Sequence, residues 1–189
     1  GKEVAFSVDQ FLGGEPVKGE PSIFNSRFGK LVPAEYGEYL KESVEGDRLE
    51  PAQKGDGLTA RQVMEEAARC LHCDCRDLQN CRLRLYSDAY EADQRRFKSE
   101  ERHLCTKQMH HKDVIYEPSK CIKCGICVRI TEQYKEDFGL TFIGRGFDVV
   151  VGVPFNETTS AGLKKVALEV ADACPTGAIS RKVELNKRS

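Results

Sequence analysis

The sequence predicts an α+β chain whose strands lie in its C-terminal part. Three observations lead to this prediction. Alternating apolar and polar residues, the pattern of strands, are found after residue 112. Before that point, apolar residues recur at helical spacing between stretches rich in glycine, proline and charge. Most of the cysteines fall into two groups, one before and one after this change of pattern. We therefore divide the chain into stretches 1–57, 58–112 and 113–189.

Composition limits the classes of protein to which the chain can belong. Its 189 residues allow one or two small domains, and its net charge of −1 gives no basic face for nucleic acid. Nine cysteines are many, but clustered neighbours rarely bridge each other, so we expect free thiols in a reducing cytoplasm. The N-terminus does not resemble a signal peptide, and no apolar stretch approaches a membrane span, so membrane contact would require a partner.

The first stretch, 1–57, is predicted to contain two helices and loops. An amphipathic helix should span Lys2–Leu12 and end at Gly13-Gly14. Its apolar positions are Val4, Phe6, Val8, Phe11 and Leu12. A second helix should begin at Pro33, because proline suits the first turn, and run to about Val44. Gly46 to Gly57 is a turn-rich linker.

The second stretch, 58–112, is predicted to be mainly helical. Thr59 and Gln62 fit a capping box, so a helix should start there and run toward Leu71. Its buried face should consist of Val63, Met64, Ala67 and Leu71. A group of four cysteines follows with the spacing C-x2-C-x-C-x5-C, comprising Cys70, Cys73, Cys75 and Cys81. The charged segment from Arg82 to about Leu104 should form a helix with one solvated face.

The third stretch, 113–189, alternates strands and helices. In chain order the predicted elements are a strand at Asp113–Glu117, a helix at Cys127–Phe138, a β-hairpin made by Leu140–Ile143 and Phe147–Val153, a helix at Leu163–Ala173 and a strand at Ile179–Leu185. The last strand can pair with the first one.

A regular cysteine pattern lies between the first strand and the first helix of this stretch. Cys121, Cys124 and Cys127 recur every third residue, and the remote Cys174 is followed by proline. A ferredoxin holds a cubane iron–sulfur cluster with this pattern. Gly125 lets the backbone pass close to inorganic sulfide. We therefore expect a ferredoxin-like C-terminal module with an inserted β-hairpin and one [4Fe-4S] cluster, preceded by a mainly helical iron–sulfur segment.

The expected number of clusters follows from counting the cysteines that could be ligands. A two-cluster ferredoxin has a fourth cysteine in the C-x2-C-x2-C run, and Thr131 stands at that position here. A second [4Fe-4S] cluster would therefore belong to the Cys70–Cys81 group. Zinc is the alternative, since it also binds four thiolates, usually as two C-x2-C pairs. Three crowded cysteines and one remote cysteine favour a cubane over zinc at Cys121–Cys174, while the irregular Cys70–Cys81 group leaves zinc a stronger competitor.

Three other residues could take part in the Cys70–Cys81 site. Cys105 is the ninth cysteine, and it could replace a ligand or be a small buried apolar residue. His110 and His111 could ligate iron or form an exposed pair before the strand. A third hypothesis is an iron–sulfur enzyme in which one iron of this group lacks a protein ligand and binds substrate.

The predicted activity is single-electron transfer, which needs no acid, base or nucleophile. The spacing picks out no such catalytic arrangement, so we expect the electron-transfer part of an oxidoreductase without catalytic residues of its own. Lys123 and Arg129 flank the ligand loop. Positive charge there would raise the reduction potential, unless both side chains point to water.

Two resemblances extend this interpretation. The stretch from Tyr116 through CIKCGICVRI and IGRGFDVVVGVPF to ACPTGAI resembles the iron–sulfur region of the large iron–sulfur subunit of complex I and of iron-only hydrogenases. The resemblance covers about residues 115–180 and implies a [4Fe-4S] cluster that relays electrons. Cys75 to Cys81 with the following Arg-Leu-Arg looks like the neighbouring cluster site of that family, although His72 stands where a cysteine is expected.

The second resemblance lies upstream. Glu65 to Cys73 resembles the iron–sulfur domain of the glutamate synthase small subunit and dihydropyrimidine dehydrogenase, and Gly1 to Val8 is similar to the closing helix of their FAD/NAD(P)-binding part. It implies that the chain is the C-terminal portion of a longer oxidoreductase. The chain has no G-x-G-x-x-G, so FAD and NAD(P) would sit on a partner or upstream domain. The expected partners are a flavoprotein domain or subunit and a redox acceptor protein.

Overall fold

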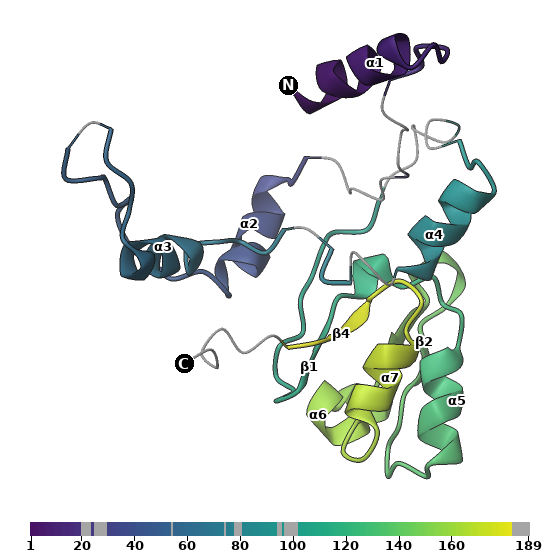
Figure 1. Ribbon diagram of the computed structural model, residues 1–189. Coiled ribbons are helices and arrows are strands. Elements are labelled where there is room, and N and C mark those ends of the chain that lie inside the picture. Colours follow the sequence, from purple (N-terminus) through teal and green to yellow (C-terminus); the bar gives the residue numbers. More distant parts are fainter. Residues whose placement is uncertain are drawn as a thin grey trace.

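The computed structural model describes residues 1–19, 24, 30–53, 55–73, 75–77, 81–93, 96 and 102–182. The four strands are short and form two antiparallel pairs, with helices between and around them (Figure 1). This is an α+β arrangement, as the sequence predicts. Among the described residues, no helix is both long enough and apolar enough to cross a bilayer.

The main apolar core is built by the C-terminal part of the chain. Its elements are β1 (Val114–Tyr116), α5 (Ile126–Gln133), β2 (Thr141–Ile143), β3 (Val150–Gly152), α6 (Thr159–Gly162), α7 (Ala167–Ala173) and β4 (Ile179–Arg181). The core residues include Val114, Tyr116, Leu140, Val151, Val153, Leu163, Val166, Val170 and Ile179. α7 packs against α5, β1 and β4, so it closes one side of the β1–β4 pair.

The strand pairing brings distant parts of the chain together. β1 and β4 run antiparallel with Ile115 opposite Ser180, which confirms the predicted pairing of the first and last strands. β2 and β3 also pair antiparallel, with Phe142 opposite Val151, and a 3₁₀ turn at Gly146–Asp148 lies between them. Leu185, the predicted end of the last strand, lies outside the described residues.

A buried histidine fixes the start of β1. His111 Nδ1 accepts hydrogen bonds from the backbone N–H of Asp113 at 3.0 Å and of Val114 at 3.3 Å. Because Nδ1 accepts, Nε2 carries the hydrogen and donates to the carbonyl of Leu163 at 2.9 Å. The ring therefore ties β1 to the segment between α6 and α7. Both ring nitrogens are committed to the backbone, so His111 is not placed to bind a metal.

Some predicted helices are shorter in the structure, for identifiable reasons. The helix predicted for Leu163–Ala173 begins only at Ala167, because Glu136 Oε1 accepts the N–H groups of Lys165 at 2.6 Å and Val166 at 3.1 Å. α4 (Arg82–Ala89) ends far before Leu104, and Glu91 just beyond it has a left-handed φ of 50°. Part of the predicted Arg82–Leu104 helix lies outside the described residues.

The helix predicted for Cys127–Phe138 also ends early. α5 stops at Gln133, and Lys135 shortly after it adopts a left-handed φ of 51°. The left-handed region costs about 1–2 kcal/mol for a residue with a Cβ atom, and it ends a right-handed helix. Side-chain periodicity continues past this point, so the pattern alone could not indicate where the backbone turns.

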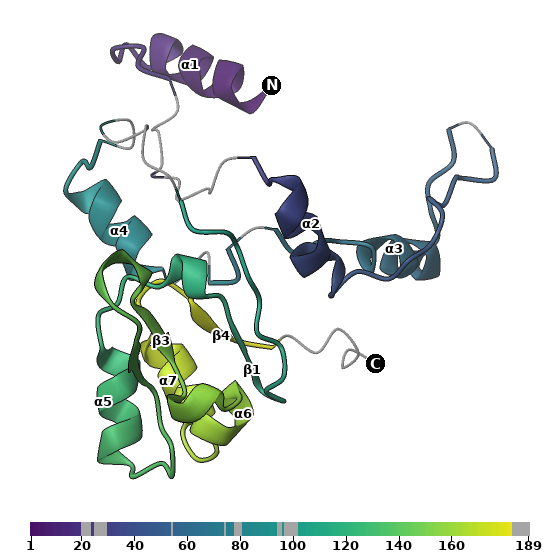
Figure 2. The same cartoon turned by 180° about the vertical axis from the view of Figure 1, so that it is seen from behind.

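The N-terminal helices lie away from this core (Figure 2). α1 (Lys2–Leu12) has the predicted bounds, and α2 (Pro33–Leu40) ends four residues before the predicted Val44. α3 (Ala60–Ala67) begins after the predicted capping box, in which Gln62 N–H donates to Thr59 Oγ1 at 3.4 Å.

The predicted buried face of α3 is wrong. Val63 and Met64 are 51% and 61% exposed, and none of the residues of this helix is buried. α3 projects from the molecule in Figure 1, so its apolar stripe faces outward in the described part of the chain. The apolar residues of α1 are exposed as well. Periodicity predicts which residues share a face but does not indicate whether a partner element covers that face.

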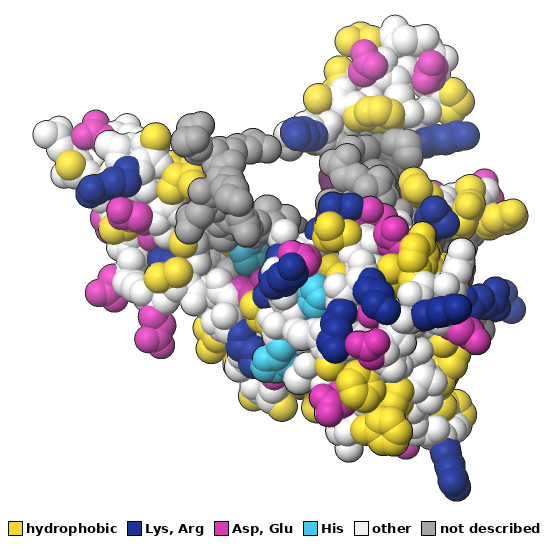
Figure 3. Space-filling model, turned by 90° about the horizontal axis from the view of Figure 1, so that it is seen from below, with side chains coloured by type: hydrophobic (Ala, Val, Ile, Leu, Met, Phe, Trp, Pro, Cys, Tyr) yellow, Lys and Arg dark blue, Asp and Glu magenta, His cyan; other side chains and the backbone are white. Residues whose placement is uncertain are grey.

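The charged side chains of the surface are mixed in sign. Lys and Arg lie beside Asp and Glu on the face shown in Figure 3, without a continuous basic region there. This distribution agrees with the near-neutral net charge of −1.

One buried ion pair attaches α2 to the segment that leads into β1. The Glu35 side chain is fully buried and accepts hydrogen bonds from Arg102 Nη2 at 2.7 Å, Cys105 N–H at 2.7 Å and Val32 N–H at 2.8 Å. The pKa of the Glu35 carboxyl lies well below its usual range, mainly because of the hydrogen bond from the Arg102 guanidinium. Burial opposes this shift, but the donors outweigh it.

We expect Glu35→Gln to lower the free energy of unfolding by roughly 3 kcal/mol at pH 7, because it leaves the Arg102 charge without its partner. Since the native pKa is depressed, the Glu35 contribution is fully present above the unfolded value of about 4.3 and declines as pH falls below it. Urea unfolding at pH 7, 5 and 3 should therefore show the difference between the two proteins shrinking toward acid.

The exposed Glu132 of α5 supplies the control. Glu132→Gln should change the free energy of unfolding by less than about 0.5 kcal/mol at each pH. A loss in Glu35→Gln that stays constant from pH 7 to pH 3 would contradict the ion-pair assignment.

Candidate metal centre

Four cysteines from two distant segments line one cavity. Cys121 and Cys124 lie in the loop between the 3₁₀ helix Pro118–Lys120 and α5, Cys127 lies in the first turn of α5, and Cys174 follows α7 directly. Because α7 packs on β1 and α5, the end of α7 reaches the ligand loop. The part of the cavity that the centre of a water molecule can reach has a volume of about 20 Å³. Most of its other lining residues are apolar, among them Tyr116, Ile122, Ile126, Val151, Ala178 and Ile179.

The loop backbone is shaped for close approach to sulfur. Gly125 has a φ of 75°, and a Cβ atom there would lie 3.5 Å from the ring of Phe142. Lys123 N–H donates to Cys121 Sγ at 3.4 Å, and Ile179 N–H donates to Cys174 Sγ at 3.5 Å. Such N–H groups stabilise negative charge on sulfur, so the loop suits thiolates rather than thiols.

The cysteines differ in their exposure to solvent. Cys124 is exposed, whereas Cys121, Cys127 and Cys174 are partly buried. Burial is the largest cause that raises the pKa of Cys127 to about 11, and it also raises the pKa of Cys121. Cysteines bind metals as thiolates, so binding of a positively charged metal core would displace their protons.

The donor set can be compared with the group that the sequence predicts. Four sulfur ligands suit either zinc or an iron–sulfur cluster. Within the described residues, no three His, Cys, Asp or Glu side chains meet at a point that could hold one ion. The four thiols share the wall of one largely apolar cavity. This set of four sulfur donors suits a cubane.

Thr131, which stands where a two-cluster ferredoxin has a cysteine, is not among the residues that line the cavity. Its buried hydroxyl donates to the carbonyl of Val128 at 2.9 Å and accepts the N–H of Leu140 at 3.0 Å. The position thus holds the end of α5 against the start of β2.

The second cysteine group is only partly assembled. Cys70 and Cys73 are exposed after α3, Cys75 is half-buried, and Cys81 is buried at the start of α4. Burial is the main cause of the raised pKa of the Cys75 thiol. In the described ranges, which omit residues 74 and 78–80, the four thiols do not converge on a site for one ion.

The two cysteine groups are joined by direct backbone contact. The N–H groups of Arg82 and Leu83, next to Cys81, donate to the carbonyl of Pro175 at 2.9 and 3.4 Å. Asp77 packs against Gly177, where an added Cβ atom would lie 2.7 Å from the Asp77 Cβ. The segment that carries Cys75 and Cys81 therefore lies on the turn that carries Cys174.

The remaining candidate residues take structural positions. Cys105 is buried beside α2, where Arg102 Nη1 lies 3.6 Å from its sulfur and its N–H is bound by Glu35. His110 is exposed, and the ring of His111 is occupied by the backbone as described above. Arg129 is exposed, and Lys123 Nζ donates to the carbonyl of Phe147 at 3.3 Å.

One residue of the cavity wall was missed in the sequence. Tyr116 is buried beside the cysteines, and its hydroxyl donates to the carbonyl of Val151 at 2.7 Å. Burial is the main cause that raises its pKa, and the nearby Cys121 and Cys127 add to the effect. The alternation of the strand identifies Tyr116 as apolar core, but it does not indicate that the ring faces a metal site.

Comparison with known proteins gives a match to a family and matches to solved structures. Residues 112–180 match the family model for the ferredoxin-like domain of NADH-quinone oxidoreductase subunit 3. A crystal structure of an NAD⁺-reducing [NiFe]-hydrogenase in the H₂-reduced state aligns with a TM-score of 0.47 and 23% identity over 58% of this chain. This chain covers 47% of the hydrogenase chain, about half of its length. The family match supports a ferredoxin-like module in residues 112–180, as the sequence predicts.

Proposed function

We propose that the chain carries two [4Fe-4S] clusters and relays electrons between a flavin-containing oxidoreductase part and a further acceptor. The ligands are Cys121, Cys124, Cys127 and Cys174 for one cluster and Cys70, Cys73, Cys75 and Cys81 for the other. A bound cubane supplies one-electron chemistry with little change in geometry. The observation that carries the proposal is the backbone contact between the segments of the two groups.

The chain's own residues hold and insulate the first cluster. The apolar wall that includes Tyr116 and Val151 keeps water from the inner side of the cavity. The N–H groups of Lys123 and Ile179 stabilise charge on two of the thiolates. Cys124 is exposed, so this corner offers the shortest route for an electron to a partner protein.

The contact between the segments supports relay between the clusters. Arg82 N–H and the carbonyl of Pro175 form a hydrogen bond of 2.9 Å, and each residue directly follows a proposed ligand, Cys81 or Cys174. Little polypeptide therefore separates the two sites. A pair of clusters so placed can exchange electrons without large motion of the chain.

The wider assembly is also part of the proposal. The resemblance to the glutamate synthase small subunit supports an assembly in which a flavoprotein partner or an upstream domain binds FAD and NAD(P). In this assembly, residues 1–57 are the tail of the flavoprotein part and residues 58–112 carry the second cluster. Residues 113–189 form the ferredoxin-like module with the first cluster. Free thiols in both groups suit a reducing cytoplasm.

Zinc is the second candidate, and one observation favours it at the Cys70–Cys81 group. Cys70 and Cys73 form an exposed C-x2-C pair, and neither of them lines the cavity of the first group. A zinc ion binds such pairs for structural purposes. A zinc site there would leave one iron–sulfur cluster and remove the relay.

Anaerobically prepared protein should contain about eight iron and eight sulfide per chain and no stoichiometric zinc. Cys174→Ser should lose about four irons, because it removes one ligand of the first cluster. Cys105→Ser is the matched control and should keep eight, since Cys105 is not among the proposed ligands. Iron and sulfide assays with metal analysis give these numbers. Four irons with one zinc in the wild-type protein would refute the two-cluster function.

Gly177→Ala should weaken the contact between the two segments. Its left-handed φ of 64° and its approach to Asp77 leave no room for a methyl group, so we expect a loss of about 1–3 kcal/mol in the free energy of unfolding. Thermal unfolding followed by circular dichroism measures the loss. Gly46→Ala, where an added Cβ atom meets no atom within 4 Å, is the control. Equal stability of both variants would show that Asp77 does not pack on the Cys174 turn.

A further inference from the structure

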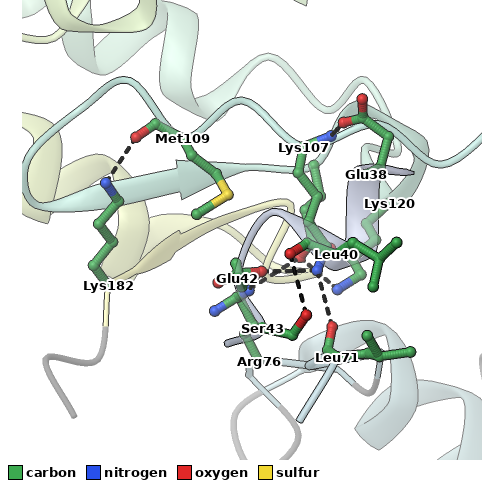
Figure 4. Close-up of polar contacts among 11 residues, drawn as sticks. Glu38, Leu40, Glu42, Ser43, Leu71, Arg76, Lys107, Met109, Lys120 and Lys182 are labelled. Carbon is green, nitrogen blue, oxygen red and sulfur yellow. Dashed lines mark hydrogen bonds and ion pairs between the residues drawn. The ribbon is translucent and has the colours of Figure 1, made fainter. Parts of the chain in front are cut away.

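A group of buried charged side chains lies between the two cysteine groups. We call it the charge network, and it consists of Glu42, Arg76, Lys107, Glu117 and Lys120 (Figure 4). The side chains are only 1–10% exposed, which is rare for charged residues. They come from four separate parts of the chain, so the fold itself gathers them.

The contacts of the charge network form a continuous line. Lys107 Nζ lies 2.8 Å from Glu42 Oε2, and Glu42 also pairs with Arg76. Arg76 Nε lies 3.7 Å from Glu117 Oε2, which pairs with Lys120 Nζ at 2.5 Å. The carbonyl of Leu71 also accepts from Lys107 Nζ, at 3.3 Å. In Figure 4 the side chains of Glu42, Lys107 and Lys120 point toward one another, and Arg76 lies beside Glu42.

The line of contacts includes a residue next to each cysteine group. Arg76 directly follows Cys75, and Lys120 directly precedes Cys121. Glu117 pairs with both Arg76 and Lys120, so its carboxylate links the residues next to the two cysteine groups.

The charges within the network do not balance. It holds three cations and two carboxylates, which leaves one positive charge in excess among buried groups. In the part of the chain that the structure describes, the buried Arg76 Nε has no hydrogen-bond acceptor. An uncompensated buried charge is costly, so such an excess is retained where an anion offsets it. An iron–sulfur cluster with its four thiolates is anionic, and it becomes more so on reduction.

We propose that the charge network raises the reduction potentials of both clusters and that Glu117 acts on the two together. This inference rests on the proposed two-cluster function. Glu117 is a positioning residue, because it pairs with Arg76 and Lys120 and is not one of the proposed ligands. The positive excess favours the reduced form of each cluster, and the Glu117 carboxylate limits that effect.

The test is a redox titration of the intact, anaerobically prepared protein, monitored by electron paramagnetic resonance. Glu117→Gln removes a negative charge and should raise both potentials. The expected rise is about 59 mV per one-electron couple, which corresponds to about a tenfold increase in the equilibrium constant of reduction. Lys120→Gln removes a positive charge and should lower both by a similar factor. A structural disturbance would not give opposite signs in the two variants.

Two exposed ion pairs supply matched controls. Asp172→Asn and Lys164→Gln make the same changes of charge at side chains that are 57% and 52% exposed, and each should shift the potentials by less than twofold in the equilibrium constant. If Glu117→Gln does not retain its iron, Glu42→Gln takes its place as the second network variant. Its potentials are also expected to shift upward. Iron content is measured for every protein.

The outcomes separate the two proposals. Wild-type protein with only four irons refutes both the relay and the shared action of the charge network. Eight irons, with potentials that move no more in the network variants than in Asp172→Asn, refute the charge network alone. Shifts of the same sign in Glu117→Gln and Lys120→Gln also refute it. Opposite shifts in both clusters support it.

Discussion

The packing of α7 against the β1–β4 pair is the constraint on which the rest of the molecule depends. β1 leads into the ligand loop and β4 leaves the Cys174 turn, so their antiparallel register sets the distance between two segments some fifty residues apart in sequence. α7 covers both strands and delivers Cys174 at its end. His111 adds to this arrangement by binding both the start of β1 and the carbonyl of Leu163. The apolar core and the metal centre are thus two results of the same packing.

The N-terminal half is attached by a different kind of force. α2 contacts the segment before β1 through charged groups, with Glu35 bound by Arg102 and Glu42 bound by Lys107. Burial raises the pKa of Glu42, but hydrogen bonds from Lys107 and Arg76 outweigh it and keep the pKa below its usual value. Buried ion pairs specify geometry more than they add stability. This attachment therefore sets where α2 lies rather than how strongly the chain folds.

The sequence predicts those features that depend on local pattern. The spacing from Cys121 to Cys127 with the remote Cys174 predicts one site, and alternation predicts the pairing of β1 with β4. It fails where distant side chains act on the backbone. The Glu136 side chain accepts the N–H groups of Lys165 and Val166, which lie far along the chain. The first turn of the helix expected at Leu163 is therefore not formed. Glu42, Arg76 and Lys107 have the composition of a solvated surface, and only the fold reveals that they are buried.

The register of β2 against β3 has a consequence for the chemical durability of the domain. Phe142 and Val151 are opposite each other and share a face, with Val151 in the wall of the cavity and the Phe142 ring over Gly125. A slip of one residue would exchange the two faces of β2 and replace this ring by Ile143. Dioxygen and peroxide attack sulfide-bridged iron from the side that solvent can reach. In the proposed cluster site, the register of a three-residue strand would therefore decide which side chain lies beside the ligand loop.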